Sequence, residues 1–392
     1  MGRALSLVFK YNLRSVAVRG TDAIMTLAGI ALCSAVVVVV SALDEGIERA
    51  FVSSGSSDVA LLLRRGAPTE TQGRIDLEAA NLVRTLEGIE GEPSREVVVI
   101  CNLPRRTDGK PANVLVRGIE APGIALRPGF HLVEGRLPAA SSAEVIAARR
   151  MAARIKNLGI GDTFAFGKSR FTVVGLFEAG GTADSEVWAP PELVQTAFDR
   201  AGNFSSVRAK LAGATEEQRQ ASLSRIQVQL EGNARMPLRV QRETAYYAAQ
   251  EENAAAIPKA LGALLALFIA IGASMGAMNT MYGRVAARSR EIATLRALGY
   301  KRPAIVMAFT AESMFLSLLG GVIGCLLALP ANGWSTATTA LSTLSEVTFE
   351  LRIGPTGVAE ALILAAAVGL IGGVLPALSA ARRSIAGALR DA

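Results

Sequence analysis

Four long apolar segments constrain the fold of this chain more than any other feature of its sequence. They span about residues 23–43, 258–282, 304–330 and 357–378. Because about 20 apolar residues in a helix cross the hydrocarbon core of a bilayer, each segment is long enough to be a transmembrane helix. The chain is therefore predicted to be an α-helical membrane protein with four transmembrane helices.

The basic residues indicate which side of the membrane each connection faces. The stretch 44–257 is nearly neutral, with 26 Lys and Arg against 27 Asp and Glu. Most other basic residues lie before the first apolar segment, between the second and third, and after the last. Since loops rich in Lys and Arg stay in the cytoplasm, both termini and residues 283–303 are predicted to be cytoplasmic. The net charge of +7 thus reflects membrane orientation, and no nucleic-acid partner is expected.

Between the first two transmembrane helices, residues 44–257 are predicted to form a mixed α/β domain outside the cytoplasm. Strands are expected at 97–100 and 113–118, a hairpin at 163–166 and 170–177, and helices at 143–157, 190–201 and 214–231. About 190 ordered residues can bury a core, and we expect two subdomains. The flanks 44–52 and 243–257 read as membrane helices that continue into a stalk.

Three shorter regions complete the predicted organisation. Residues 1–22 are expected to form a cytoplasmic amphipathic helix, because the apolar segment that follows is too long and starts too late for a cleaved signal peptide. Residues 331–356 are rich in Ser and Thr and are expected to be an extracytoplasmic loop or a small re-entrant turn. Residues 379–392 form the cytoplasmic tail.

The cytoplasmic connection 283–303 is the first candidate site. Ile292, Leu295 and Leu298 recur at helical spacing between charged residues, which predicts a short amphipathic helix at the inner membrane surface. Such a helix can be bound by a cytosolic partner, although a simple positively charged anchor would show a similar composition. Small-residue pairs in the second, third and fourth segments indicate close helix packing. These pairs are Gly272/Gly276, Gly320/Gly324 and Gly369/Gly373.

Glu312 is a charged residue within the third apolar segment. Ionisable residues inside membrane helices are usually functional. Glu312 either makes a buried polar contact in a gating region or lies near the cytoplasmic headgroups, and we favour the second interpretation because the helix can enter the membrane late.

Signals for catalysis are weak. His131 is the only histidine, and the three cysteines are far apart, so neither a zinc site nor a Ser-His-Asp triad is expected. Gly167, Lys168 and Ser169 resemble the end of a P-loop, but Asp162 stands where that motif needs glycine. The chain is therefore predicted to be non-catalytic, to hold no cofactor or metal, and to bind no ATP itself.

With these motifs in view, the chain resembles permease subunits of the MacB/FtsX/LolC family of bacterial ABC transporters. In the membrane part the resemblance lies in 279–281 (NTM), 288–299 (RSREIATLRALG), 317–324 (SLLGGVIG), 375–377 (LPA) and 380–383 (AARR). Outside the membrane it lies in 116–119 (VRGI), 132–136 (LVEGR), 161–163 (GDT) and 170–175 (RFTVVG), which are similar to the family's periplasmic core domain.

The resemblance implies an inner-membrane complex of two permeases, identical or related, with cytoplasmic ATPase subunits. MacB carries its ATPase ahead of the first transmembrane helix, whereas only about 20 residues precede it here, so a separate ATPase is expected. Membrane lipid, a periplasmic membrane-fusion adaptor and an outer-membrane channel are further expected partners. By resemblance, the ATPase-coupling residues are Arg288, Arg290, Glu291, Ile292, Leu295, Arg296, Leu298 and Gly299.

The expected function is to transmit ATP-driven movement to the outer domain and so export or extract a substrate. Ile292, Leu295 and Leu298 would supply contacts buried against the ATPase, while Arg290, Glu291 and Arg296 would fix the register. The alternative is an FtsX-like subunit that signals to a cell-wall hydrolase. The large outer segment favours export, because FtsX-type signalling domains tend to be smaller.

Overall fold

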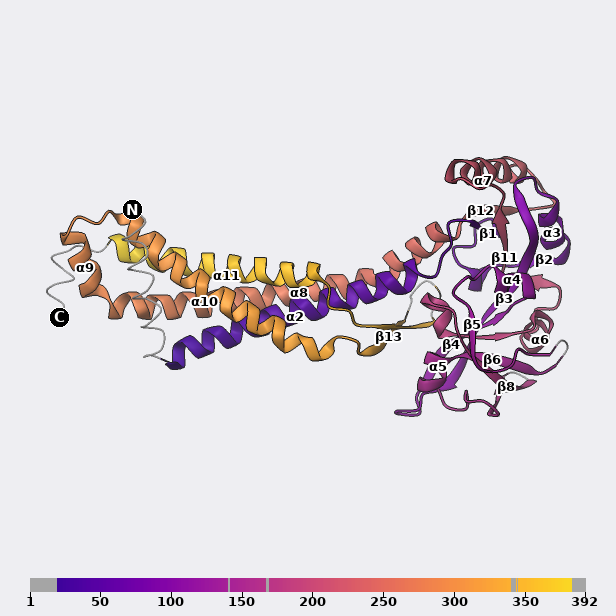
Figure 1. Cartoon of the computed structure of the whole chain (residues 1–392), viewed down its shortest axis with the longest axis horizontal. Coiled ribbons are helices and arrows are strands. Elements are labelled where there is room, and N and C mark those ends of the chain that lie inside the picture. Colours follow the sequence, from indigo (N-terminus) through magenta and orange to yellow (C-terminus); the bar gives the residue numbers. More distant parts are fainter. Residues whose placement is uncertain (1–19, 140–141, 167–168, 340–342, 344, 383–392) are drawn as a thin grey trace. The chain divides into compact units, whose positions relative to one another are not determined.

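The computed structural model describes residues 20–139, 142–166, 169–339, 343 and 345–382. The predicted N-terminal amphipathic helix and most of the cytoplasmic tail lie outside these residues. The described chain forms two compact units (Figure 1). Among the described residues, the membrane unit comprises 20–45, 257–334 and 351–382, and the outer unit comprises 46–256 and 335–350.

The structure contains the four long helices that the apolar segments predict, and the ends of two of them belong to the outer unit. These helices are α2 (Gly20–Val52), α8 (Glu243–Ala287), α10 (Arg302–Ala328) and α11 (Pro355–Arg382). Each is long and apolar enough to cross a membrane. The short helix α9 (Ser289–Ala297) follows α8, and a 3-10 turn, η4 (Leu329–Ala331), follows α10. The predicted helical flanks are confirmed, since α2 continues to Val52 and α8 begins at Glu243.

Small residues allow close helix packing in this unit. A Cβ atom added at Gly320 would lie 3.1 Å from Ile30 of α2, and one added at Gly369 would lie 2.6 Å from Ser317 Oγ of α10. Gly272 and Gly276 of α8 do not contact another helix closely. No heavy atom of a neighbouring segment lies within 4 Å of a Cβ atom built at either position. The glycine pairs on α10 and α11 thus hold helices together within the chain, and the pair on α8 leaves an open surface.

The outer unit is built around a ten-stranded sheet with the order β12-β1-β11-β3-β4-β9-β6-β8-β5, in which β7 also pairs with β8. The strands are β1 (Val59–Arg64), β3 (Ile89–Pro104), β4 (Pro111–Gly118), β5 (His131–Gly135), β6 (Glu144–Ala148), β7 (Thr163–Phe166), β8 (Ser169–Glu178), β9 (Glu186–Ala189), β11 (Ser206–Leu211) and β12 (Leu238–Arg242). The two-residue strands β2 (Ile75–Asp76) and β10 (Asn203–Phe204) pair separately.

Helices and 3-10 turns connect these strands. They are η1 (Glu70–Gln72), α3 (Leu77–Leu82), η2 (Val83–Thr85), α4 (Ala121–Ala125), α5 (Arg149–Arg154), η3 (Gly181–Ser185), α6 (Pro191–Ala197) and α7 (Glu216–Leu230). The structure confirms the predicted helix near 214–231, which begins with a Thr215–Gln218 capping box. It also confirms a shorter helix within 190–201, the strands near 97–100 and 113–118, and the predicted β7–β8 hairpin.

The long strand β3 joins the two halves of the sheet. Residues 89–96 pair with β11, and residues 97–104 pair with β4. Buried apolar residues from both halves belong to one core cluster, which includes Val207 on one side and Trp188 on the other. We expected two subdomains, but the outer part is one compact unit whose two sheet halves share a strand and a core.

Two predictions for the outer part of the chain are wrong. The predicted helix at 143–157 begins instead with strand β6, and only Arg149–Arg154 is helical. The reason is tertiary, because β6 is inserted between β8 and β9 and all its residues after Glu144 are buried. Alanine and charged residues favour helices, but sheet pairing overrides that preference.

The predicted loop or re-entrant turn at 331–356 contains a β-hairpin. Strands β13 (Ser335–Thr339) and β14 (Glu346–Glu350) pair with each other and belong to the outer unit. The hairpin is fixed there by a 2.7 Å hydrogen bond between the Ser185 and Thr348 hydroxyls and by an ion pair between Arg105 and Glu346. A second ion pair joins Arg150 to Glu350.

Candidate functional site

The candidate coupling helix α9 is bounded by turns at both ends. Arg288 precedes it in a non-helical conformation, and Gly299 follows it with φ of 92°. This left-handed conformation suits glycine, which lacks a Cβ atom. The Gly299 N–H donates to the Arg296 carbonyl at 3.1 Å, and Arg302 then begins α10. The helix is thus a short, separate segment between two membrane helices.

One face of α9 packs onto the chain's own membrane helices. Ile292 and Ala293 are buried, and Ile292 joins a cluster with Met281 of α8, Phe309 of α10 and Ala380 of α11. We predicted that Ile292 would make contacts buried against a partner. The structure contradicts this prediction, because the Ile292 side chain is already buried against the chain's own membrane helices.

The opposite face of α9 is open in this chain. Leu298 is 73% exposed, and Arg290, Glu291 and Thr294 are also exposed. Leu295 and Arg296 are partly buried at the boundary between the two faces. Of the three apolar residues singled out from the sequence, Leu298 is therefore the one most available to a partner. An exposed apolar surface rimmed by polar residues is a candidate interaction site.

Glu312 connects α10 to the residues just before α9. Its Oε1 accepts a hydrogen bond from Arg284 Nη1 at 2.8 Å, and its Oε2 accepts one from Arg288 Nη1 at 3.2 Å. The Glu312 side chain is only 4% exposed. Glu312 therefore makes a buried polar contact with the end of α8 and with the residue that precedes α9. A buried carboxylate needs opposite charges to compensate for its lost hydration. The two pairs with arginine therefore fix the start of α9 against α10.

We predict that Ile292→Ala destabilises the membrane unit. The substitution removes a buried side chain from the α8–α9–α10–α11 cluster, and such cavities cost about 2–5 kcal/mol. The midpoint of thermal unfolding of the full chain in detergent should fall, whereas Thr294→Ala on the exposed face should leave it nearly unchanged. Equal midpoints for the two variants would contradict the buried position of Ile292.

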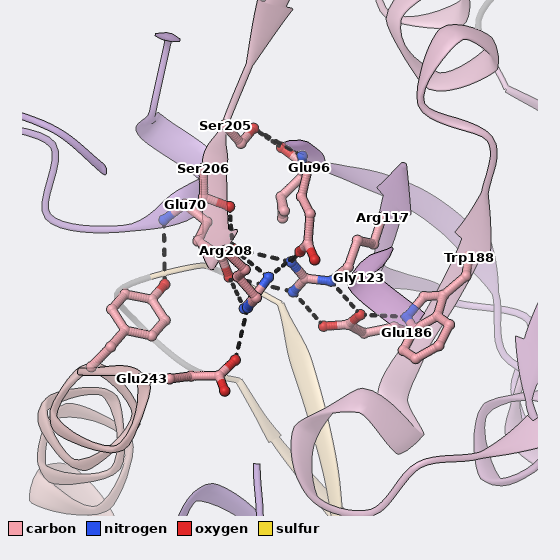
Figure 2. Close-up of polar contacts among 12 residues, drawn as sticks. Glu70, Glu96, Arg117, Gly123, Glu186, Trp188, Ser205, Ser206, Arg208 and Glu243 are labelled. Carbon is pink, nitrogen blue, oxygen red and sulfur yellow. Dashed lines mark hydrogen bonds and ion pairs between the residues drawn. The ribbon is translucent and has the colours of Figure 1, made fainter. Parts of the chain in front are cut away.

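A second polar cluster lies inside the outer unit (Figure 2). It consists of Glu70, Glu96, Arg117, Arg127, Glu186, Arg208 and Glu243. The side chains of all but Arg127 are at most 5% exposed. Charged residues are rarely buried unless they are paired, so this cluster requires an explanation.

Each charge in the cluster has several partners. Glu96 on β3 accepts from Arg117 at 2.7 Å and from Arg127 at 2.9 and 3.0 Å, and it also pairs with Arg208. Glu186 on β9 accepts from Arg117 through both oxygens, each at 2.7 Å. Glu70 accepts from the Ser206 hydroxyl at 2.6 Å. The cluster thus joins η1, β3, β4, β9 and β11.

Burial and charge pairing act in opposite directions on these carboxyl groups. Burial alone would raise the pKa of Glu70, but the charges of Arg117 and Arg208 outweigh it and hold the pKa well below 4.5. Burial likewise opposes ionisation of Glu96, whose pKa is lowered by Arg127, Arg208 and Arg117. Both groups are therefore ionised at neutral pH.

The lowered pKa values predict loss of stability in acid. A carboxyl group with a lower pKa in the folded state stabilises the fold above its unfolded pKa and ceases to do so as pH falls through the folded value. The free energy of unfolding of the outer unit should therefore be nearly constant above pH 5 and fall progressively below about pH 4.5. Urea titrations of the full chain followed by tryptophan fluorescence measure this, and stability that rises in acid would contradict the pairing.

The sequence analysis missed this cluster, although a signal was present. Glu96 precedes the apolar run 97–100, Arg117 follows 114–116, and Arg208 lies between Val207 and Ala209. A charged residue within an otherwise buried strand needs a partner. The partners are distant in sequence, so nothing local identifies them. Among the described residues, no group of three or more His, Cys, Asp or Glu has the arrangement of a metal site.

Family comparisons agree with this architecture of membrane helices and an inserted α/β domain, which is that of an ABC transporter permease. Residues 23–238 match the MacB-like periplasmic core domain, and residues 263–385 match the FtsX-like permease C-terminal domain. The first match covers more than half of the chain, and the chain belongs to the family of MacB-like and FtsX-like ABC transporter permeases.

Several curated proteins are similar to parts of the chain. Macrolide export ATP-binding/permease protein MacB of Hahella chejuensis is 26% identical over 57% of this chain and 34% of its own length. The protein of the same name from Brucella abortus is 36% identical over 33% of this chain and 19% of its own length. YvrN of Bacillus subtilis, an uncharacterized ABC transporter permease, is 35% identical over 29% of this chain and 26% of its own length. The chain thus matches at most about a third of these relatives.

Solved structures of related outer domains are similar at low sequence identity. The extracellular domain of YknZ, a noncanonic ABC-type transporter from Gram-positive bacteria, aligns with a TM-score of 0.35 at 16% identity, covering 47% of this chain and 99% of its own. The periplasmic region of MacB from Actinobacillus actinomycetemcomitans aligns with a TM-score of 0.38 at 16% identity, covering 50% and 94%.

Proposed function

We propose that this chain is the permease subunit of a bacterial ABC transporter that transmits ATP-driven movement of a separate ATPase to its outer domain, so that a substrate is exported or extracted. The observation that carries the proposal is α8. It is a single helix from Glu243 in the outer unit to Ala287, two residues before α9, with Pro258 inside it. At 1.5 Å per residue it is about twice as long as a bilayer core requires.

The geometry of α9 supports docking of the ATPase. Its exposed face carries Leu298 among charged residues, while its buried face and the Arg284–Glu312 and Arg288–Glu312 pairs tie it to the bundle. A partner that moves α9 would therefore move the membrane helices with it. The charge distribution supports a cytoplasmic location for α9 and both termini, with the outer unit on the opposite side of the inner membrane.

An open groove between α2 and α8 supports a second permease copy. It has a volume of about 470 Å³ and is lined by residues that include Gly29, Gly272 and Gly276. Small residues let helices from two chains approach closely in a bilayer. Exposed apolar residues on the same two helices, such as Leu32 and Phe268, provide the surrounding contact area.

The test is to purify the tagged chain from its native membranes in mild detergent and identify what accompanies it. An ATPase with a membrane-fusion adaptor supports export through an assembly that includes an outer-membrane channel. An ATPase with a peptidoglycan hydrolase supports the FtsX-like signalling role instead. A folded complex without any ATPase would overturn the proposal.

A further inference from the structure

The first residue of α8 is bound inside the outer unit. The Glu243 side chain is 4% exposed. Its Oε1 accepts a hydrogen bond from Arg208 Nε at 2.7 Å, and its Oε2 accepts one from the Ser56 backbone N–H at 3.1 Å. A carboxylate at a helix N-terminus also interacts favourably with the helix dipole. Both oxygens of Glu243 are therefore used to fix the start of α8.

The next residues of α8 add two aromatic contacts to the same cluster. The Tyr247 hydroxyl accepts from Arg208 Nη2 at 3.2 Å, and the Tyr246 hydroxyl accepts from the Glu70 backbone N–H at 3.3 Å. Both tyrosines are buried. The first turn of α8 is thus attached to β11 and η1 through contacts that each require a defined direction and distance.

Arg208 connects this turn to both halves of the sheet. It pairs with Glu96 on β3, the strand that the two halves share, and Glu96 in turn binds Arg117 on β4. Arg117 then binds Glu186 on β9 through both carboxylate oxygens. Figure 2 shows these groups converging from separate strands. A continuous chain of charge pairs therefore runs from α8 across the sheet.

The segment just after α2 makes two further hydrogen bonds besides the one from Ser56 to Glu243. The Ser54 hydroxyl accepts a 2.7 Å hydrogen bond from the Thr182 N–H at η3 and donates to the Ala50 carbonyl. No charged group takes part in these two bonds. Glu243, by contrast, connects α8 directly to a buried charge through Arg208.

Stability alone does not account for so many buried charges. Well-packed apolar side chains of similar volume usually stabilise a core as well as a buried ion network does, because dehydrating charges is costly. A network does, however, specify one geometry, since a displaced charge loses its partners in a medium of low dielectric. We propose that the Arg208–Glu243 pair is a positioning joint that makes α8 and both halves of the outer sheet move together. This inference rests on the proposed function.

The joint can be tested without any partner by Glu243→Gln in the full chain. Glutamine keeps the shape of the side chain but removes the charge that Arg208 binds. Amide hydrogen exchange of residues 247–252 should become about tenfold faster in lipid nanodiscs, because one charge-assisted bond is weakened. Tyr247→Phe, which removes only a hydroxyl, should act in the same direction. Glu78→Gln, which breaks the exposed Arg235–Glu78 pair, is the control, and unchanged exchange in both test variants would overturn the joint.

Transmission is tested in the complex with the ATPase. A spin label at the exposed residue 163, in a variant lacking the native cysteines, reports the distance between the outer units of two copies with and without ATP. In Glu243→Gln the ATP-driven change should be lost while ATP hydrolysis continues. A wild-type complex that shows no change would overturn the proposed function and the transmitting role with it. Movement that is present in wild type and undiminished in the variant would overturn the joint alone.

Discussion

Replacing Glu96 with alanine is expected to lower the free energy of unfolding of the outer unit by about 3–5 kcal/mol. Glu96 is fully buried and is bound by Arg117, Arg127 and Arg208. Its removal leaves three guanidinium groups close together in a medium of low dielectric with one fewer negative charge. The cost arises from the uncompensated charges more than from the lost hydrogen bonds.

A matched control lies on the same strand. Glu90 pairs with Lys210, but both side chains are about half exposed, and exposed pairs contribute only about 0–1 kcal/mol. Urea denaturation of the full chain in detergent, followed by the fluorescence of buried Trp188 in a Trp334→Phe background, measures both variants. If Glu96→Ala lowers the free energy of unfolding no more than Glu90→Ala does, Glu96 is not bound in a buried network of charges.

Replacing Leu298 with aspartate is expected to weaken binding of the ATPase about thirtyfold or more. Truncating an interface hot-spot residue costs about 2 kcal/mol or more, and aspartate also introduces a charge that must be dehydrated. Because Leu298 is 73% exposed, the substitution should leave the melting temperature of the isolated chain nearly unchanged. Titration of the purified ATPase against the chain in nanodiscs gives the affinity.

Val228→Asp is the matched control for this substitution. Val228 is 69% exposed on α7 of the outer unit, so the variant introduces the same charge at a similarly exposed apolar site away from α9. It should bind the ATPase as the wild type does. If Leu298→Asp also binds normally, the exposed face of α9 is not the docking surface.

The structure changes which residue of the coupling segment is the best target. Ile292, Leu295 and Leu298 share one apolar stripe in the sequence, so all three appeared suitable for contact with a partner. The structure places Ile292 against Met281 and Phe309, leaves Leu295 at the boundary and exposes Leu298. A periodic pattern identifies an apolar face, but it cannot distinguish a face covered by the same chain from one left for a partner.

The sequence by itself determined the four membrane helices, their helical extensions, the inserted α/β domain and the family. These features depend on segment length, mean hydropathy and the placement of basic residues, which are local properties that the bilayer selects. The β6 strand, the β13–β14 hairpin, the Glu312 contacts and the buried cluster around Arg208 were decided only by the tertiary structure. Each depends on residues that are far apart in the chain, and a charge such as Glu96 is stable in a core only because folding brings three arginines to it.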